Sequence, residues 1–96
     1  MKFTWDPVKR EKVLAEHKVD FDKITDVFDD PFGLEFIDVE HSSEDETRFT
    51  IIGLTAQFGL IYAVYIEPSV DEIRFVTARR AEPSMVKEYD KERGRG

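Results

Sequence analysis

The chain of 96 residues has 14 Lys and Arg against 21 Asp and Glu, and its formal net charge of −7 by itself disfavours a nucleic-acid partner. This length suits one domain, and the 12% share of aromatic residues supplies the apolar area that disordered chains lack. The lack of cysteine excludes disulfides, thiolate metal sites and cysteine nucleophiles. With no signal-peptide pattern at the start and no apolar run near the roughly 18 residues of a membrane span, we expect a cytoplasmic domain without membrane contact.

The first third of the sequence predicts a strand and two helices. Residues 2–5 place Phe3 and Trp5 on one face of a short strand. Asp6 caps a helix that begins at Pro7 and ends at about residue 16. Asp20 caps a second helix that ends before Pro31. The apolar face of this second helix is predicted to consist of Phe21, Ile24, Thr25 and Phe28.

From residue 33 the apolar period changes from helical spacing to two, which predicts four strands and then a helix over 83–93. Gly53 indicates a bulge or a close backbone approach. Residues 60–66 are apolar on both faces, which is typical of a central strand. The predicted order β-α-α-β-β-β-β-α indicates an α+β domain with a mainly antiparallel sheet packed by helices. We expect one domain over 1–93 and a frayed tail at 94–96.

The negative charge is concentrated in one segment. Residues 29–46 contain eight acids and no base, so the rest of the chain is close to neutral. A solvated edge strand and loop explain this segment most simply. A docking surface for a basic partner is the second interpretation. A metal site is the third, although the spacing matches no known calcium loop. Its ligands would come from Asp38, Glu40, His41, Glu44, Asp45 and Glu46.

Two histidines can exchange protons near neutral pH. His17 lies at the end of the first predicted helix, where it is either a C-terminal cap or a general acid or base. His41 lies among acids on a predicted loop, and we expect no role for it. We therefore take His17 as the candidate proton-transfer residue.

Arginines provide the candidate phosphate ligands, because guanidinium binds phosphate bidentately. Arg79 and Arg80 end the last predicted strand and point to opposite faces. Strict alternation places Arg79 on the face of Ile73, Phe75 and Thr77. Arg48 begins the central hairpin, where it can pair with Glu46 or reach a phosphate. Tyr89 in the last helix is expected to pack.

A set of short motifs runs in order along nearly the whole chain: Phe3-x-Trp5-Asp6-x-x-Lys9, His17, Val19-x-Phe21, Val27-Phe28-x-Asp30, Glu46-x-Arg48, Gly53, Ala78-Arg79-Arg80-Ala81 and Tyr89. In this set the sequence resembles the BrnT toxin family, which are ribonucleases of type II toxin–antitoxin systems with a RelE-like fold. Three positions depart from the family pattern. Glu16 and Lys18 flank His17 where the family usually has Lys and Gly, and Met85 stands where a glutamate is usual.

The resemblance implies RNA cleavage, and we expect it to proceed without a metal, because the 2′-OH is an internal nucleophile. His17 would transfer the proton, and Arg79 and Arg48 would hold the phosphate. Further substrate contacts would come from Lys9, Lys18, Arg80 and Tyr89, with Tyr89 stacking on a base. No cofactor is implied.

The resemblance also implies a cognate antitoxin of the ribbon-helix-helix kind in a two-plus-two assembly, with DNA contacted only through that antitoxin. One alternative is a catalytically impaired family member that serves as an antitoxin-binding or protein-binding module. The other is a small protein-binding domain unrelated to toxins.

Overall fold

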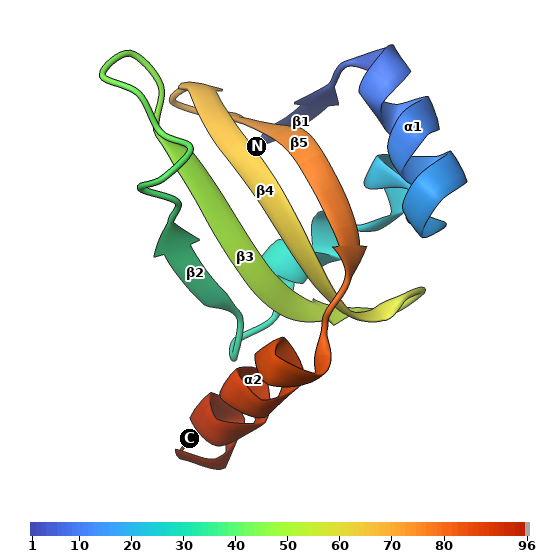
Figure 1. Cartoon of the computed structure of the whole chain (residues 1–96), viewed down its shortest axis with the longest axis vertical. Helices are drawn as coiled ribbons and strands as arrows, with labels where there is room; N and C mark the ends of the chain where they lie inside the picture. The colour runs from blue at the N-terminus through green and yellow to red at the C-terminus, as the bar shows by residue number, and fades with distance from the viewer. Residues whose placement is uncertain (96) are drawn as a thin grey trace.

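The structure, a computed structural model, describes residues 1–95 and forms an α+β domain around one five-stranded sheet (Figure 1). The predicted fold class is confirmed. Across the sheet the strands follow the order β1 (Lys2–Trp5), β5 (Glu72–Arg80), β4 (Gly59–Ser69), β3 (Arg48–Thr55) and β2 (Leu34–Ile37). Neighbouring strands pair antiparallel except β1 and β5, which are parallel. The run predicted as central is the middle strand, β4.

Helix α1 (Pro7–His17) follows its sequence signals closely. The Asp6 carboxylate accepts a hydrogen bond from Val8 N at 2.9 Å, which satisfies one of the free N–H groups of the first turn. The helix ends because Lys18 adopts the left-handed conformation, φ 59°, and its N–H donates to Leu14 O at 3.1 Å. This cap fixes the direction in which His17 leaves the helix.

The prediction of one continuous second helix is wrong. Two short 3₁₀ turns, η1 (Phe21–Lys23) and η2 (Thr25–Asp29), replace it. The first begins with the Asp20 cap, whose carboxylate accepts from Asp22 N at 3.1 Å. The residues fully buried against the sheet are Phe21, Ile24 and Val27. Their spacing of three matches the 3.0-residue period of a 3₁₀ helix and not the 3.6 of an α-helix.

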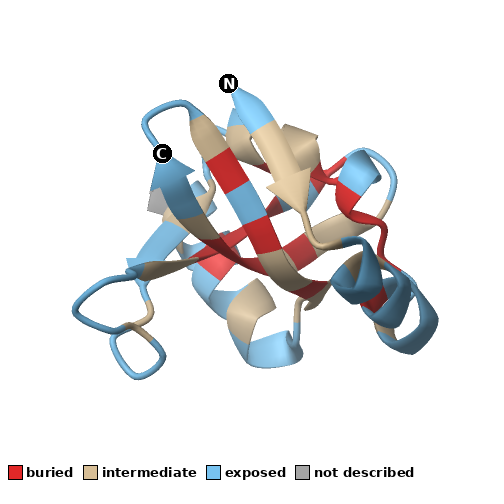
Figure 2. Cartoon of the chain, turned by 90° about the horizontal axis from the view of Figure 1, so that it is seen from above, coloured by how far each residue is buried: buried red, intermediate tan, exposed pale blue. Residues whose placement is uncertain are grey.

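The core lies between these 3₁₀ turns and one face of the sheet. In Figure 1 the turns lie behind the strands, and Figure 2 shows the buried residues in the middle of the strands and in the segment after α1. Gly53 makes the predicted close approach: a Cβ there would lie 2.8 Å from Val27 Cγ2 and 3.2 Å from Val27 O. Only glycine lets β3 pack this closely on η2.

Asp30 joins three parts of the chain at the end of η2. Its Oδ2 accepts from Tyr89 Oη at 2.6 Å and from Leu54 N at 2.8 Å, and its Oδ1 accepts from Phe32 N at 2.9 Å. Burial alone would raise the pKa of Asp30, but these hydrogen bonds and the charge of Arg93 lower it overall.

Helix α2 (Pro83–Arg95) is attached to the sheet by this contact. The helix runs two residues beyond the predicted end at 93, so residues 94 and 95 of the predicted frayed tail are helical, while residue 96 lies outside the described part. No helix within residues 1–95 is long and apolar enough to span a membrane.

A β-bulge in β5 corrects the predicted alternation of its side chains. Tyr65 pairs with Phe75, but the preceding Val64 pairs with Thr77, so Val76 is an extra residue on β5. Phe75 therefore faces the core, while Thr77 and Arg79 face the opposite side of the sheet. The bulge changes the face on which the end of the strand presents its side chains. This opposite side, away from the 3₁₀ turns, is called the open face below.

Candidate active site

A pocket of about 280 Å³ on the open face brings together the three residues predicted to act in catalysis. His17 comes from the end of α1, Arg48 from the start of β3 and Arg79 from the end of β5. The other lining residues are Asp38, His41, Tyr62, Val64 and Thr77. Residues far apart in the sequence thus supply two imidazoles and two guanidinium groups to one cavity, which is called the two-histidine pocket below.

His17 is half-buried at the C-terminus of α1, as the sequence predicted. The free carbonyl groups of the last turn favour a positive charge there. The nearest carboxylate is that of Glu16, whose Oε2 lies 3.9 Å from His17 Nε2. This distance is too long for a hydrogen bond.

Arg79 is held from two sides and stays partly exposed. Its Nη2 lies 3.2 Å from Glu82 Oε1, and its guanidinium carbon lies 5.1 Å from the centre of the Tyr62 ring. Such a cation–π contact restricts the guanidinium without using its N–H groups. Within the described chain, the buried Nε of Arg79 has no hydrogen-bond partner. The Arg79 side chain is 41% exposed, so its outer N–H groups, and not the buried Nε, are the donors that an anion can reach.

Arg48 reaches the pocket from β3, on the other side of β4 from Arg79. Its Nε lies 3.6 Å from Glu46 Oε1, which bears out the predicted pairing with Glu46. Its backbone is fixed on both sides, since Arg48 N donates to Ser42 Oγ at 2.9 Å and Arg48 O accepts from Asp38 N at 2.8 Å. The long contact to Glu46 leaves most of the five guanidinium N–H groups available.

His41 is the residue that sequence reasoning missed. It was expected to have no role, yet it lines the two-histidine pocket. Its Nδ1 lies 3.0 Å from Asp38 Oδ2 and 3.2 Å from Asp38 Oδ1. The signal available in the sequence was the Asp-x-x-His spacing in a loop, which allows such a local pair.

The four predicted substrate-binding residues lie outside the two-histidine pocket. Lys9 lines a neighbouring pocket of about 250 Å³, to which Arg48 also contributes. The Nζ of Lys18 donates to Ala15 O at 3.1 Å, so this side chain caps α1. Arg80 points to the other face, 5.9 Å from the Phe58 ring centre. Tyr89 is buried against Asp30, as packing would require.

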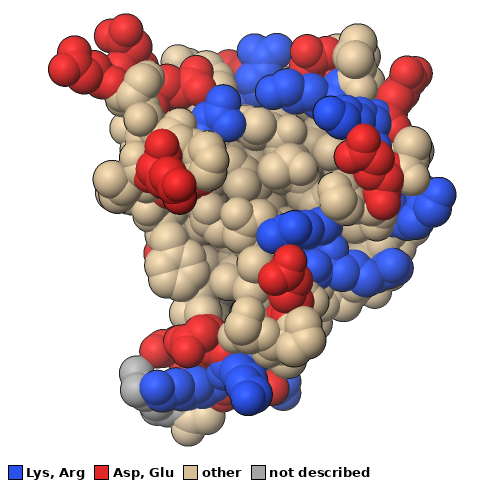
Figure 3. Space-filling view, viewed as in Figure 1, with Lys and Arg blue, Asp and Glu red and all other residues tan. Residues whose placement is uncertain are grey.

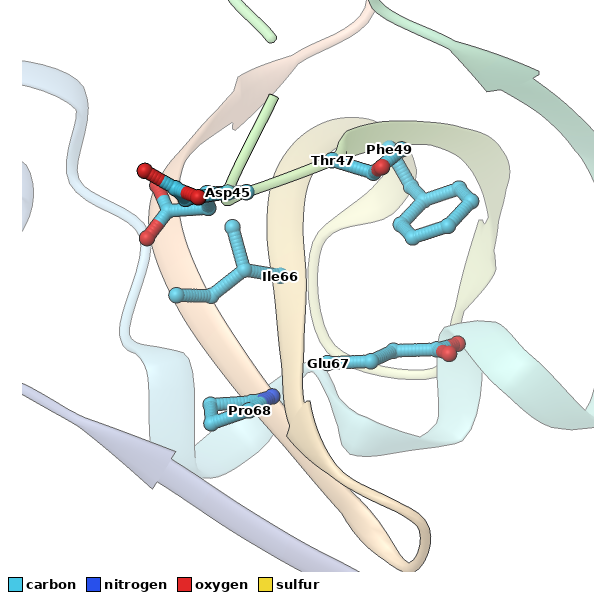
Figure 4. Close-up of a pocket in the computed structure, with 7 residues that line it drawn as sticks. Asp45, Thr47, Phe49, Ile66, Glu67 and Pro68 are labelled. Atoms are coloured by element: carbon cyan, nitrogen blue, oxygen red, sulfur yellow. The ribbon is translucent and has the colours of Figure 1, made fainter. Parts of the chain in front are cut away.

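The charge distribution distinguishes the two-histidine pocket from a second cavity beside the same acidic loop. Figure 3 shows an uncharged centre on the open face bordered by Lys and Arg toward α1 and β5, with acids gathered over the loop between β2 and β3. Another cavity, of about 390 Å³, is lined by Asp45, Glu46 and Glu67 and by no Lys or Arg. Figure 4 shows Glu67 and Phe49 directed to the opposite side of β4 from Ile66. This cavity therefore lacks the cations that a phosphate needs.

Metal ligation is not supported by the arrangement of the acids. Among residues 1–95, no three His, Asp or Glu side chains lie close enough together to hold a metal ion. The acidic loop is organised instead by its own hydrogen bonds, such as those from Ser42 Oγ to Asp38 O at 2.6 Å and from Ser43 N to Glu46 O at 2.8 Å.

Comparison with known families identifies the chain. The sequence profile of the family described as "Ribonuclease toxin, BrnT, of type II toxin-antitoxin system" matches residues 5–84. The chain belongs to the BrnT family. Its structure is similar to the crystal structure of the Brucella abortus ribonuclease toxin, BrnT, with a TM-score of 0.68 and 23% identity over 85% of this chain and 97% of that one. No curated protein sequence matches.

The BrnT motifs in this chain fall into two groups by position. Asp30, Gly53 and Tyr89 meet around η2 and β3, outside the two-histidine pocket, and hold the fold together. His17, Arg48 and Arg79 meet in the two-histidine pocket. As a BrnT toxin, the protein is a ribonuclease toxin of a type II toxin–antitoxin system.

Proposed function

We propose that this BrnT toxin cleaves RNA by attack of a 2′-OH on the adjacent phosphate in the two-histidine pocket. The observation that carries the proposal is the convergence of His17, Arg48 and Arg79 in one cavity. Cleavage of this kind needs a group that moves protons and cations that stabilise the charge on the pentavalent phosphorus. These three side chains meet both requirements.

Arg79 binds the scissile phosphate in this mechanism. Glu82 and Tyr62 fix its guanidinium, and the side chain is 41% exposed, so outer N–H groups remain accessible to a phosphate. Donors that are already oriented pay no reorganisation cost when charge develops. Arg48 approaches from the facing side and completes the neutralisation of the phosphate.

His17 accepts the proton of the attacking 2′-OH. Imidazole is the side chain best suited to this near neutral pH. Because the nucleophile belongs to the substrate, the first step needs no metal-activated water. The products are a 2′,3′-cyclic phosphate and a 5′-hydroxyl end.

The test is cleavage of RNA by the purified protein with magnesium and with a chelator. We expect equal rates in both, cyclic phosphate and 5′-hydroxyl ends, and no cut at a position that carries a single 2′-deoxy substitution. RNA that stays intact under both conditions, or products with 5′-phosphate ends, would contradict the proposal.

A catalytically impaired module is the second candidate, because the Glu16 carboxylate lies 3.9 Å from His17 where the family usually has a base. A carboxylate beside the pocket opposes the approach of a phosphate. Glu16→Lys separates the two candidates. For the enzyme we expect faster cleavage at low salt. For the module, neither form cleaves RNA and both bind the same protein partner.

The proposed partner is a DNA-binding antitoxin of the ribbon-helix-helix kind in a cytoplasmic two-plus-two complex. The support is the free edge of β2, where exposed Phe36, Ile37 and Val39 lie within the acidic segment 29–46. An apolar surface with acidic surroundings complements a basic partner and repels a second copy of itself.

Co-purification with the neighbouring gene product and light scattering test this partner and its stoichiometry. We expect Phe36→Asp with Ile37→Asp to weaken the complex by at least about tenfold, as loss of a buried apolar anchor does. The control is Val70→Asp, a fully exposed apolar residue on another turn. An unchanged affinity in the double variant places the antitoxin elsewhere.

A further inference from the structure

We propose that His41, oriented by Asp38, is a second proton-transfer group of the active site and protonates the leaving 5′-oxygen. This inference rests on the proposed ribonuclease function and adds to it a residue that the family motifs do not include. The carrying observation is that both histidines of the chain line the same pocket, although they come from α1 and from the loop after β2.

The loop that carries His41 is held in place by a chain of hydrogen bonds. Asp38 N donates to Arg48 O at 2.8 Å, and Ser42 Oγ donates to Asp38 O at 2.6 Å. Arg48 N then donates to Ser42 Oγ at 2.9 Å. His41 is thus tied through the loop to the same backbone that positions Arg48 in the pocket.

Asp38 fixes the imidazole of His41. Both carboxylate oxygens of Asp38 lie within 3.2 Å of His41 Nδ1, and Asp38 Oδ1 also accepts from His41 N at 3.3 Å. The side chain of Asp38 is 19% exposed and that of His41 is 63% exposed, so a mostly covered carboxylate orients a ring that a substrate can reach. With Nδ1–H bound to Asp38, Nε2 is the nitrogen left to exchange a proton.

Two imidazoles divide the reaction between them. His17 takes the proton from the 2′-OH as the bond from the 2′-oxygen to phosphorus forms. His41 in its protonated form, paired with Asp38, gives its Nε2 proton to the 5′-oxygen as the bond from phosphorus to that oxygen breaks. Both rings then return to their starting states by exchanging one proton each with water, so atoms and charge balance.

The charged groups that face these rings belong to several elements. His17 faces Glu16 within α1 and Arg79 of β5 in the pocket. His41 faces Asp38 in its own loop and Arg48 of β3.

The decisive experiment compares two dinucleotide substrates that differ in the leaving atom. One has the ordinary 5′-oxygen, and the other has a bridging 5′-sulfur, which leaves as a thiolate without protonation. We expect His41→Asn to slow cleavage of the oxygen substrate about 100-fold or more and to cleave the sulfur substrate at nearly the wild-type rate. His17→Asn should slow both substrates.

The pH profile gives a second readout that a structural role would not produce. The wild type should show a bell-shaped dependence of kcat/KM. His41→Asn should lose the decline at high pH, and Asp38→Asn should cleave the oxygen substrate about tenfold more slowly. Glu40→Gln, in the same exposed loop, is the matched control and should match the wild type in both profile and thermal unfolding.

The outcomes separate this inference from the proposed function. Suppose that the wild type cuts the oxygen substrate, but His41→Asn slows cleavage of both substrates equally or of neither. The assignment of His41 as the acid is then wrong, while the ribonuclease function stands. If the wild type cuts neither substrate, the proposed function itself fails.

Discussion

Asp30 and Asp38 belong to the same acidic segment, but Asp30 supports the fold and Asp38 lies at the proposed active site. Asp30 is half-buried at the end of η2, where Tyr89 and the backbone of Leu54 and Phe32 donate to it. Asp38 lies at the two-histidine pocket, where it faces the ring of His41. The difference shows that an acidic residue in the sequence does not by itself indicate whether its carboxylate belongs to a surface or to a functional site. The partner that tertiary structure brings to each carboxylate decides its role.

The same division applies to the two arginines that end β5, and it yields the largest expected effect. Arg79→Ala should lower RNA cleavage about 10²–10³-fold, because it removes a prepositioned donor to the phosphate. Arg80→Ala is the matched control, since Arg80 lies one residue away on the other face beside Phe58. Single-turnover rates measure both. Equal losses in the two variants would show that only the local positive charge matters.

Asp30→Ala should affect stability and not chemistry. The change leaves Leu54 N and Tyr89 Oη without their acceptor, which should lower the free energy of unfolding by about 2–3 kcal/mol. Urea unfolding measures this loss, and cleavage per folded molecule should stay unchanged. Asp29→Ala, the exposed neighbour, should change stability little. A catalytic loss in folded Asp30→Ala would remove the distinction between the two aspartates.

Acid should weaken the fold through the carboxylates that lie inside it. Hydrogen bonds from Arg10 lower the pKa of Asp20, and the pKa of Asp30 is also lowered in the fold. A lowered folded pKa contributes stability above the unfolded value of about 3.9, and this contribution is lost as the pH falls through the folded values. Unfolding free energies measured from about pH 6 to about pH 3 should therefore fall, and Asp30→Ala should reduce the slope.

Tyr89→Phe tests the interpretation of Tyr89 as a substrate contact. Burial and the Asp30 carboxylate raise the pKa of Tyr89 to about 12, which keeps its Oη protonated as a donor. Removing this one hydrogen bond should cost about 1–2 kcal/mol of stability, because the acceptor is charged. Cleavage should not change. A rise in KM with unchanged stability would show instead that the Tyr89 hydroxyl contacts the substrate.

Lys18→Gly should give the smallest effect, with the opposite sign. Lys18 holds a left-handed φ of 59°, which side chains other than glycine adopt at a cost. Glycine at this helix end should raise the free energy of unfolding by about 0.5–1 kcal/mol. Thermal unfolding measures the gain. Unchanged cleavage would exclude Lys18 as a phosphate ligand, and a loss would restore that role.

The sequence predicted which elements carry His17, Arg79 and Arg80. It did not predict that His41 lines the pocket. The Asp6 cap and the start at Pro7 placed His17 at the end of α1, and strand alternation put Arg79 and Arg80 on opposite faces. The alternation also assigned Arg79 to the face of Phe75, which is the core. The bulge at Val76 moves Arg79 to the open face. The position of a bulge depends on how β5 pairs with β4, and the sequence of β5 alone does not show this pairing.

The sequence by itself determined the ends of α1, the strands and the family, because caps, periodicity and motif order depend on neighbouring residues. Tertiary structure alone decided that 3₁₀ turns replace a helix, that Tyr89 reaches Asp30, and that His41 joins His17 in one pocket. These features depend on contacts between residues distant in the chain. The free energy of burying Phe21, Ile24 and Val27 against the sheet outweighs the local preference for an α-helix.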